Sequence, residues 1–513
     1  MVFNNSILLG AGGQTTGQAP FDPTLIGNSI WLDGSADFLN RQNGSDFSNR
    51  KEVTLSFWVQ RNKLASQQAI FAGLEGGQGF IIQFMSGDTF QLHLNGSANL
   101  TTNAVFRDIG WYHILVSIDT SQALSTDRSK VYINGEQITS FSSAAYPSQD
   151  SNIPGISGQM TSSENMRIGN YNNSVSNFYF WKGYIAQACM IESKSIQQGD
   201  FAVSDFLDTS TFGTNGSQVV PKKDSDIAAL ASAAGGNSFC LDFGDSSDLG
   251  NDISSNNNDF TPTSMDSSNQ TVHTPSLQFP VLNVLNGDPF LVAALGYGNR
   301  LADGVSPWDS VFATKSMGKS GKYYYEVRMA LDTGSNGFIA GIHEESTTSK
   351  NWSNYIGNTT STYGLGYALY TSAPNFYTNG SPTALTGYSS DIATGDIIMM
   401  AVDLDNNKLY WGRNGTFFNS GDPANGTGES TTIQADTEYV FGVSPGTEHF
   451  FVNFGQDSTF GGETTAGNNT DANGVGDFKY TVPTGFQCLA SSSLTAPDFQ
   501  GIDYFDTTLY EGN

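Results

Sequence analysis

Short runs that alternate hydrophobic and polar residues, separated by turn residues, fill the chain from about residue 28 to 206. The run Val53-Thr-Leu-Ser-Phe-Trp-Val59 places every second residue on one apolar face, and similar runs follow at 80–84, 90–94 and 111–119. Within 131–138 the pair Asn134-Gly135 is typical of a two-residue hairpin turn. This pattern predicts a β-sandwich over residues 28–206.

Three tryptophans lie in these strand patterns and are expected in the core: Trp58, Trp111 and Trp181. Phe57 and Trp58 are neighbours and must point to opposite faces of their strand. One of the two therefore has to face outward or into a second layer.

Strand patterns return between residues 285 and 490, at 322–328, 338–342, 397–403, 408–412 and 450–454. They predict a second sandwich over 285–490. Between the two, residues 207–284 are interpreted as an ordered connector, whose single predicted helix is Asp226–Ala234, ended by Gly235-Gly236. Residues 1–27 are predicted to form an extended N-terminal arm and residues 491–513 a C-terminal tail.

The predicted fold class is therefore all-β, with two antiparallel β-sandwiches, a connector and an N-terminal arm. Neither half alternates helices with strands, which argues against a doubly wound nucleotide-binding fold.

The chain is acidic: 22 Lys and Arg face 49 Asp and Glu among 513 residues, a net charge of −27. This balance argues against binding nucleic acid or an anionic membrane, both of which need clustered basic residues. Only 14% of residues are charged, so Ser, Thr, Asn and Gln must supply most of the polar surface. Such a hydrogen-bonding surface resembles those of secreted and virion β-proteins.

Targeting signals are not apparent in the sequence. Residues 1–10 lack a basic region followed by an apolar stretch, so no secretion signal is expected. No apolar run approaches the ~20 residues that span a bilayer, so no membrane insertion is expected. The expected setting is a cytoplasm in which the protein is made before it is built into a larger assembly.

The three cysteines, Cys189, Cys240 and Cys488, cannot all pair with one another and show no metal-binding spacing. Cys189 and Cys488 lie in apolar runs, where the expectation is a buried free thiol.

The first sandwich resembles the concanavalin A-like, laminin-G-type jelly roll. The motifs that carry the resemblance are 53–59, 111–119, Val131-Tyr-Ile-Asn-Gly, Ile168-Gly-Asn and Trp181-Lys-Gly-Tyr-Ile-Ala, in the expected order over 28–206. The second sandwich resembles the SPRY (B30.2-like) fold. Its motifs are Gly321-Lys-Tyr-Tyr-Tyr-Glu-Val, Phe338-Ile-Ala-Gly-Ile, 397–403 with Lys408-Leu-Tyr-Trp, Phe451-Val-Asn-Phe-Gly-Gln and Pro483-Thr-Gly-Phe.

The pairing of these two modules resembles structural proteins of tailed bacteriophages. Segments such as Asn237-Ser-Phe-Cys-Leu-Asp-Phe243 and Tyr504–Asn513 contribute to the resemblance. The resemblance implies a virion appendage: a tail fibre, a tail-associated receptor binder or a head fibre. It also implies a homo-oligomer, by analogy with phage fibres a trimer, with other virion proteins as partners.

The sequence does not predict an enzyme. Jelly rolls that hydrolyse glycans need two carboxylates on one strand face, and no strand here carries such a pair. Asp403 and Asp405 precede Asn406-Asn407, which predicts a hairpin turn instead. No catalytic residues are therefore assigned, and a glycan depolymerase is kept only as a third hypothesis.

Calcium is the one cofactor that the sequence leaves open. Residues 468–477 are rich in the oxygen ligands that Ca²⁺ prefers, and Asp471, Asn473 and Asp477 are the candidate ligands. The segment does not match an EF-hand loop, and solvated turns are the alternative interpretation.

Aromatic and amide residues interleave between 350 and 390 without strand alternation, a pattern typical of binding loops on a rigid sandwich. Aromatic rings stack on the apolar faces of sugars, while amides bind their hydroxyls. The candidate ligand-binding residues are Trp352, Tyr355, Tyr363, Phe376, Tyr377, Asn379 and Tyr388. The alternative is that half of these rings fill the mouth of the sandwich.

The leading hypothesis is a non-enzymatic phage virion protein that binds a polysaccharide or receptor on the host surface. The second is a capsid decoration protein, head fibre or structural adaptor that makes protein contacts. Burial of the 350–390 aromatics in a protein interface would distinguish the second from the first.

Overall fold

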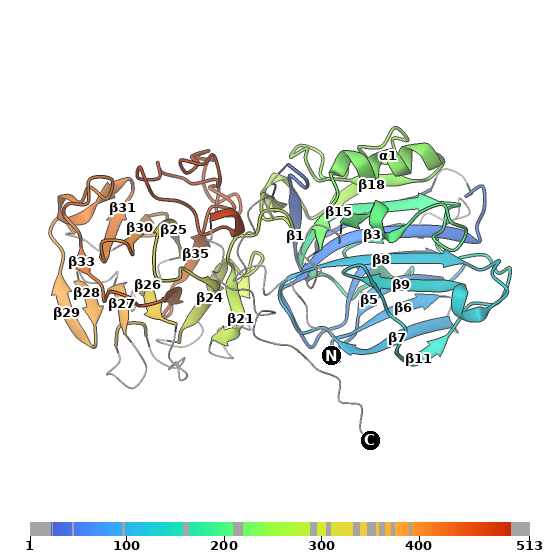
Figure 1. Ribbon diagram of the computed structural model, residues 1–513, viewed down its shortest axis with the longest axis horizontal. Coiled ribbons are helices and arrows are strands. Elements are labelled where there is room, and N and C mark those ends of the chain that lie inside the picture. Colours follow the sequence, from blue (N-terminus) through green and yellow to red (C-terminus); the bar gives the residue numbers. More distant parts are fainter. Residues whose placement is uncertain are drawn as a thin grey trace, which may run out of the picture. The chain divides into compact units, whose positions relative to one another are not determined.

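The structure is a computed structural model of the 513-residue chain. It describes residues 22, 24–43, 46–94, 98–156, 164–208, 219–287, 295–303, 309–331, 339–345, 355–358, 365–370, 375–388 and 392–493. The chain forms two compact units (Figure 1), of which unit 1 is residues 1–277 with 494–513 and unit 2 is residues 278–493. Most of the predicted arm and tail lies outside the described residues.

Unit 1 contains two antiparallel sheets. The strands of the first sheet are β1 (Ser29–Asp33), β3 (Glu52–Arg61), β8 (Trp111–Asp119), β9 (Ser129–Ile133), β10 (Glu136–Gln137), β15 (Lys182–Glu192), β18 (Phe239–Leu241) and β20 (Gln270–Thr271). They lie in the order β10-β9-β8-β3-β15-β1-β20, and β18 also pairs with β15.

The strands of the second sheet are β2 (Phe38–Arg41), β4 (Gln68–Glu75), β5 (Gln78–Phe84), β6 (Thr89–Leu94), β7 (Ala98–Val105), β11 (Phe141–Ala145), β12 (Met166–Ile168) and β19 (Thr261–Thr263). Their order is β11-β7-β6-β5-β4-β12-β2-β19. Two short hairpins accompany the sheets: β13 (Tyr171–Asn172) with β14 (Asn177–Phe178), and β16 (Leu207–Asp208) with β17 (Val220–Pro221).

The core of unit 1 fills the space between these two sheets. Alternate residues of β3, including Phe57, join Phe71 and Phe80 of the second sheet in one apolar cluster. Trp58 points the other way, lies next to His113 and is also buried. Trp58, Trp111 and Trp181 are 3%, 2% and 0% exposed, so their prediction as core residues is confirmed.

A second layer covers the outer face of the first sheet. Helix α1 (Asp224–Ala234) packs against β15 and β18, with Ile227 and Ala231 among its buried residues (Figure 1). The helix begins two residues before the predicted start, and Gly235 follows it at φ +71° as its predicted end.

The segment interpreted from sequence as a connector is instead divided between the units. Its strands β18, β19 and β20 pair with β15, β2 and β1, so residues up to 277 extend the sheets of unit 1. The physical reason is that each of these strands is only two or three residues long, too short to show a period in sequence. Unit 2 begins at Gln278.

The expectation of a free thiol at Cys189 is wrong. Cys189 and Cys240 lie opposite each other in β15 and β18, with a Cα–Cα distance of 4.2 Å, and form a disulfide. Because 51 residues separate the two cysteines, the sequence did not indicate that they lie opposite each other in paired strands. Cys488 is buried and free, as predicted.

Unit 2 also contains two antiparallel sheets. The first holds β21 (Leu282–Gly287), β24 (Val311–Ser316), β26 (Ile339–Glu344), β27 (Gly366–Tyr370), β28 (Asn375–Thr378), β29 (Ser381–Ala384) and β34 (Tyr439–Ser444). Its order is β21-β24-β34-β26-β27-β28-β29, which makes β29 an edge strand.

The second sheet of unit 2 holds β22 (Leu295–Gly296), β23 (Leu301–Asp303), β25 (Lys322–Leu331), β30 (Ile397–Asp403), β31 (Lys408–Arg413), β32 (Thr416–Phe417), β33 (Thr431–Thr432) and β35 (His449–Asn453). Its order is β22-β23-β35-β25-β30-β31-β32, with β33 beside β31. Tyr325 of this sheet lies 4.3 Å from Phe441 of the other, ring centre to ring centre, so aromatic side chains join the two layers.

The all-β prediction is confirmed, and in the described residues α1 is the only α-helix. Each strand predicted from alternation coincides with a strand of the structure. Two predicted hairpin turns are also present, with Asn134 at φ +53° and Asn407 at φ +57°. None of the described helices is long and apolar enough to cross a membrane.

Candidate functional site

Three half-buried tyrosines form a cluster at one end of the first sheet of unit 2. Tyr370 lies at the end of β27, Tyr377 lies in β28, and Tyr355 lies in the segment 355–358. The ring centre of Tyr377 is 5.9 Å from that of Tyr355 and 5.8 Å from that of Tyr370, both edge to face. We call these three residues the tyrosine cluster.

Backbone geometry holds segment 355–358 against the strand that carries Tyr377. Gly357 has φ +83°, and a Cβ atom there would lie 2.7 Å from the carbonyl oxygen of Tyr377. The carbonyl oxygen of Gly357 accepts a hydrogen bond of 2.7 Å from the amide of Gly380. Only glycine allows this approach, so the local sequence fixes where Tyr355 meets Tyr377.

Strand β29 leaves the neighbourhood of the cluster open to solvent. Its four residues are all exposed, and Pro382 lies opposite Tyr377 in the ladder. Asn379 and Gly380, at φ +50° and +75°, form the tight turn between β28 and β29. The predicted ligand residue Asn379 is therefore a turn residue, exposed beside the cluster.

The phenol group of Tyr355 is a neutral hydrogen-bonding group at physiological pH. Burial raises the pKa of Tyr355, and the neighbouring phenols of Tyr377 and Tyr370 raise that pKa further. Neutral phenols combine an apolar ring with one hydroxyl, the pairing that suits a sugar ring and its hydroxyl groups.

The structure brings together only part of the predicted set. Phe376 and Tyr388 are 6% and 4% exposed, and their rings pack on Trp411 and Phe418, respectively. Both are core residues; Phe376 points to the opposite face of β28 from its neighbour Tyr377. Trp352 and Tyr363 lie outside the described residues.

Tyr370 completes the cluster and was not among the predicted ligand residues. In the sequence it is one of the interleaved aromatic residues of 350–390, and nothing there singled it out as a ligand residue. Tyr370 pairs with Asn375, which lies two residues before Tyr377 in β28, so both tyrosines lie on one face of the sheet, and this pairing is visible only in the folded sheet.

Two of the three candidate calcium ligands, Asp471 and Asp477, accept hydrogen bonds from backbone amides. Asp471 is buried and accepts from the amides of Asn473 at 2.8 Å, Val475 at 3.0 Å and Cys488 at 3.1 Å. Asp477 accepts from the amide of Ser458 at 3.0 Å. Among the residues described, no three His, Cys, Asp or Glu side chains lie close enough together to hold a metal ion.

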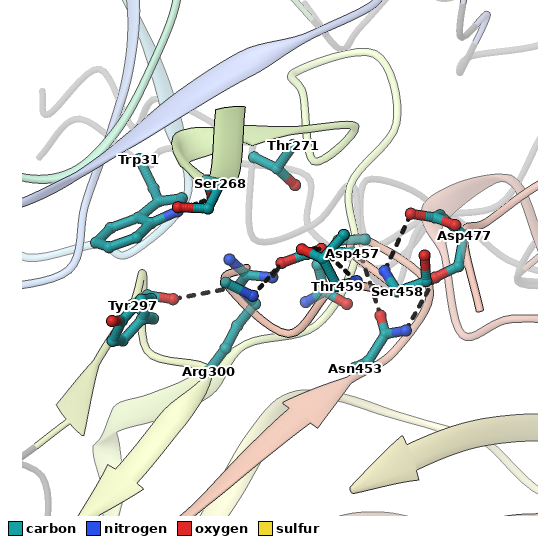
Figure 2. Close-up of polar contacts among 12 residues, drawn as sticks. Trp31, Ser268, Thr271, Tyr297, Arg300, Asn453, Asp457, Ser458, Thr459 and Asp477 are labelled. Carbon is teal, nitrogen blue, oxygen red and sulfur yellow. Dashed lines mark hydrogen bonds and ion pairs between the residues drawn. The ribbon is translucent and has the colours of Figure 1, made fainter. Parts of the chain in front are cut away.

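A buried ion pair anchors the loop that follows β35 (Figure 2). Arg300 donates to Asp457 at 2.7 Å, and the side chains are 0% and 6% exposed. Asp457 also accepts from Thr459 and Gly461. Burial alone would raise the pKa of Asp457, but the Arg300 charge and these donors hold it below its usual value. The guanidinium lies over the ring of Phe451, so the pair is part of the core.

Burial raises the pKa of three described carboxyl groups, Asp37, Asp224 and Glu326, into the range that a catalytic acid needs, and Glu326 is the one in unit 2. Burial raises the pKa of Glu326 to about 7. Its oxygens accept from the amides of Lys479 and Tyr480 at 2.9 and 2.8 Å and from the hydroxyl of Tyr324 at 3.0 Å. The side chain is 0% exposed, so Glu326 ties residues 479–480 to β25 and is closed to a substrate.

The carboxylates considered for catalysis have structural contacts as well. Asp403 accepts from Asn406 in the turn after β30 and pairs with Lys322 at 2.9 Å. Asp405 accepts from the amide of Gly321 at 2.8 Å. The turn predicted at this point is confirmed.

Comparison with known proteins supports a concanavalin A-like domain in unit 1. Residues 33–192 match the family model described as the concanavalin A-like lectin/glucanases superfamily. This range runs from β2 to the end of β15 and includes strands of both sheets. It confirms the concanavalin A-like fold expected there. No curated protein sequence matches the chain.

Part of the chain is also similar to solved SPRY domains. The SPRY domain of human HERC1 is 18% identical, with 33% of this chain and 96% of that chain covered and a TM-score of 0.25. For the PSpry domain of TRIM65 the identity is 15%, the coverage 34% and 90%, and the TM-score 0.24. Both likenesses concern the fold alone.

Proposed function

We propose that the chain is a non-enzymatic structural protein of a tailed-phage virion that binds a host-surface glycan or receptor. The observation that carries the binding proposal is the tyrosine cluster: three half-buried phenol rings beside an exposed edge strand and the exposed Asn379. The proposal that the protein is part of a virion rests on the sequence resemblance to structural proteins of tailed bacteriophages.

The surface chemistry is consistent with an uncharged ligand. A net charge of −27 repels polyanions, while the polar surface is dominated by hydroxyl and amide groups. Single sites of this kind bind weakly, and a homo-oligomer, proposed to be a trimer, would convert weak sites into avid attachment. Light scattering on the purified protein measures this oligomeric state.

The test is binding of the fluorescently labelled full-length protein to candidate host cells. Tyr377→Ala removes the central ring, which touches both other rings, and is expected to weaken binding about tenfold or more. Phe417→Ala is the matched control, because Phe417 is a half-buried aromatic of the other sheet. It should leave binding unchanged. Equal binding by both variants would contradict the role of the cluster.

A second function is favoured by the edge strand itself. The exposed β29 can pair with a strand of another protein, as expected of a capsid decoration protein or structural adaptor. Folded protein that binds no host cell but co-purifies with particles would favour this role. Release of reducing ends from host polysaccharide would instead establish a depolymerase, and addition of EDTA tests any need for calcium.

A further inference from the structure

Strand β11 forms one edge of the second sheet of unit 1, and this edge is open. In the described part of the chain β11 pairs with β7 alone, on its inner side (Figure 1). Ser142, Ser143 and Ala144 are exposed, and Phe141 and Ala145 are half-buried. An edge strand directs about half of its backbone N–H and C=O groups away from the sheet. The outer side of β11 therefore offers a row of hydrogen-bonding groups to another strand.

The other edge strands of the described sheets carry features that limit such pairing. Proline removes a backbone donor from β19 at Pro262 and from β29 at Pro382. The register of β21 shifts between Leu282 and Gly287, which leaves a large bulge in that edge. The edge strands β10, β20, β22 and β32 are two residues long. Among the described edges, β11 is the one that exceeds four residues, lacks proline and charge, and has no more than a single bulge, at residues 141–143.

The strands behind this edge are uncharged as well. β6, β7 and β11 contain no Asp, Glu, Lys or Arg, and burial lowers the pKa of His93, which favours its neutral form. No charged residue occurs between Gln137 and Gln149. Because each copy of the chain has a net charge of −27, two copies repel each other over most of their surfaces. An uncharged edge is a place where they can meet without like charges in contact.

The side chains of β11 suit a close approach by an identical strand. After Phe141 the strand contains only Ser and Ala, which are small enough for a second strand at the usual spacing of about 4.8 Å. The hydroxyl of Ser143 donates to Oδ1 of Asn99 at 2.7 Å, and that of Ser142 donates to the carbonyl oxygen of Thr101 at 3.2 Å. Both hydroxyls are therefore directed to β7 and do not cover the outer backbone groups.

We propose that β11 pairs antiparallel with β11 of a second copy of this chain, so that the second sheets of two copies continue as one sheet. Identical strands paired in this way are related by a twofold axis. Like charges on facing residues would destabilise such a pair, and β11 has none to place there. The twofold contact joins two monomers, or two of the trimers proposed above. It goes beyond the function proposed above, because it needs no ligand and lies in unit 1.

The test measures the mass of the full-length protein by light scattering and by sedimentation over a wide range of concentration. The mass is expected to double as the concentration rises. Ala144→Lys brings two ammonium groups close together in the paired strands and should weaken the association about tenfold or more. Thr383→Lys is the matched control, because it changes the net charge equally but lies on the exposed edge strand β29 of unit 2. It should associate as the unchanged protein does.

Three results would overturn the proposal: a mass that does not double at any concentration, association by Ala144→Lys equal to that of the unchanged protein, or equal weakening by Ala144→Lys and Thr383→Lys. Should Ala144→Lys fail to fold, hydrogen exchange of the unchanged protein decides. The amides of residues 142–146 should then exchange more slowly at high concentration than at low concentration, and equal exchange at both refutes the contact.

The edge contact and the function proposed above fail separately. Association that is lost in Ala144→Lys, together with cell binding that is lost in Tyr377→Ala, supports both. Cell binding that is insensitive to Tyr377→Ala removes the tyrosine cluster as a site and leaves the edge contact untouched. A stable trimer whose mass never doubles removes the edge contact and leaves the trimer.

Discussion

Replacing Asp457 by Ala removes one half of a buried ion pair and should destabilise unit 2 strongly. Asp457 accepts from Arg300 at 2.7 Å, from the amide and hydroxyl of Thr459 at 2.8 and 2.6 Å, and from the amide of Gly461 at 2.8 Å. The substitution leaves the Arg300 charge buried at 0% exposure with no counter-ion from Asp457.

Breaking a buried pair in this way costs about 3–5 kcal/mol. Unit 2 spans residues 278–493, a size at which each kcal/mol lowers the melting temperature by about 2–4 °C. The expected decrease is therefore about 10 °C. Arg300→Met should cost less, because Asp457 keeps its Thr459 and Gly461 donors and Met still packs on Phe451.

Differential scanning calorimetry of the full-length protein at pH 7 measures this effect, with one transition expected for each unit. The matched control is Asp436→Asn, which removes the charge from an exposed pair with Lys319 at 3.1 Å, suits the φ of +53° at this position and should cost less than about 0.5 kcal/mol. Equal shifts for the two aspartate variants would refute the reasoning that burial determines the cost.

Three further predictions use the same transitions. Cys189→Ala with Cys240→Ala should lower the unit 1 transition, by about 4 kcal/mol for a closed loop of 51 residues, and non-reducing mass spectrometry checks the bond itself. The pKa of Glu326 is raised to about 7 in the folded protein, so unit 2 should gain roughly 3 kcal/mol as pH falls from 8 to 4, and Glu326→Gln should abolish this gain in pH-dependent melts. Phe376→Ala should cost about 3–5 kcal/mol in thermal melts, whereas Tyr377→Ala should cost less than half as much, because only Phe376 is in the core.

The long strand runs predicted the fold because each keeps an alternating or continuous apolar pattern over five or more residues. The 53–59 and 397–403 runs lie in β3 and β30, and Asn134-Gly135 forms its expected turn. The short strands β18, β19 and β20 were not predicted, since a stretch of two or three residues has no measurable period. Their pairing depends on long-range packing, and so does the disulfide that joins β18 to β15.

The candidate site could be predicted only as a region. Interleaved tyrosines and asparagines drew attention to 350–390, but composition does not tell which rings face inward. Phe376 and Tyr377 are neighbours in a strand, so their side chains point to opposite faces. Phe376 lies in the core, and Tyr377 lies at the surface.

The chain enters and leaves the described part of unit 1 at the same place. The hydroxyl of Ser276 accepts from the amide of Ile26 at 3.1 Å and donates to its carbonyl oxygen at 3.0 Å, next to the antiparallel pair of β1 and β20. Force applied between residues 26 and 276 would therefore pull both strands from one end and break their few hydrogen bonds one after another. The long ladders β3·β8 and β3·β15 would bear no load until these strands had separated. Under tension unit 1 can thus yield first at β1 and β20, while the other strands of its two sheets stay paired.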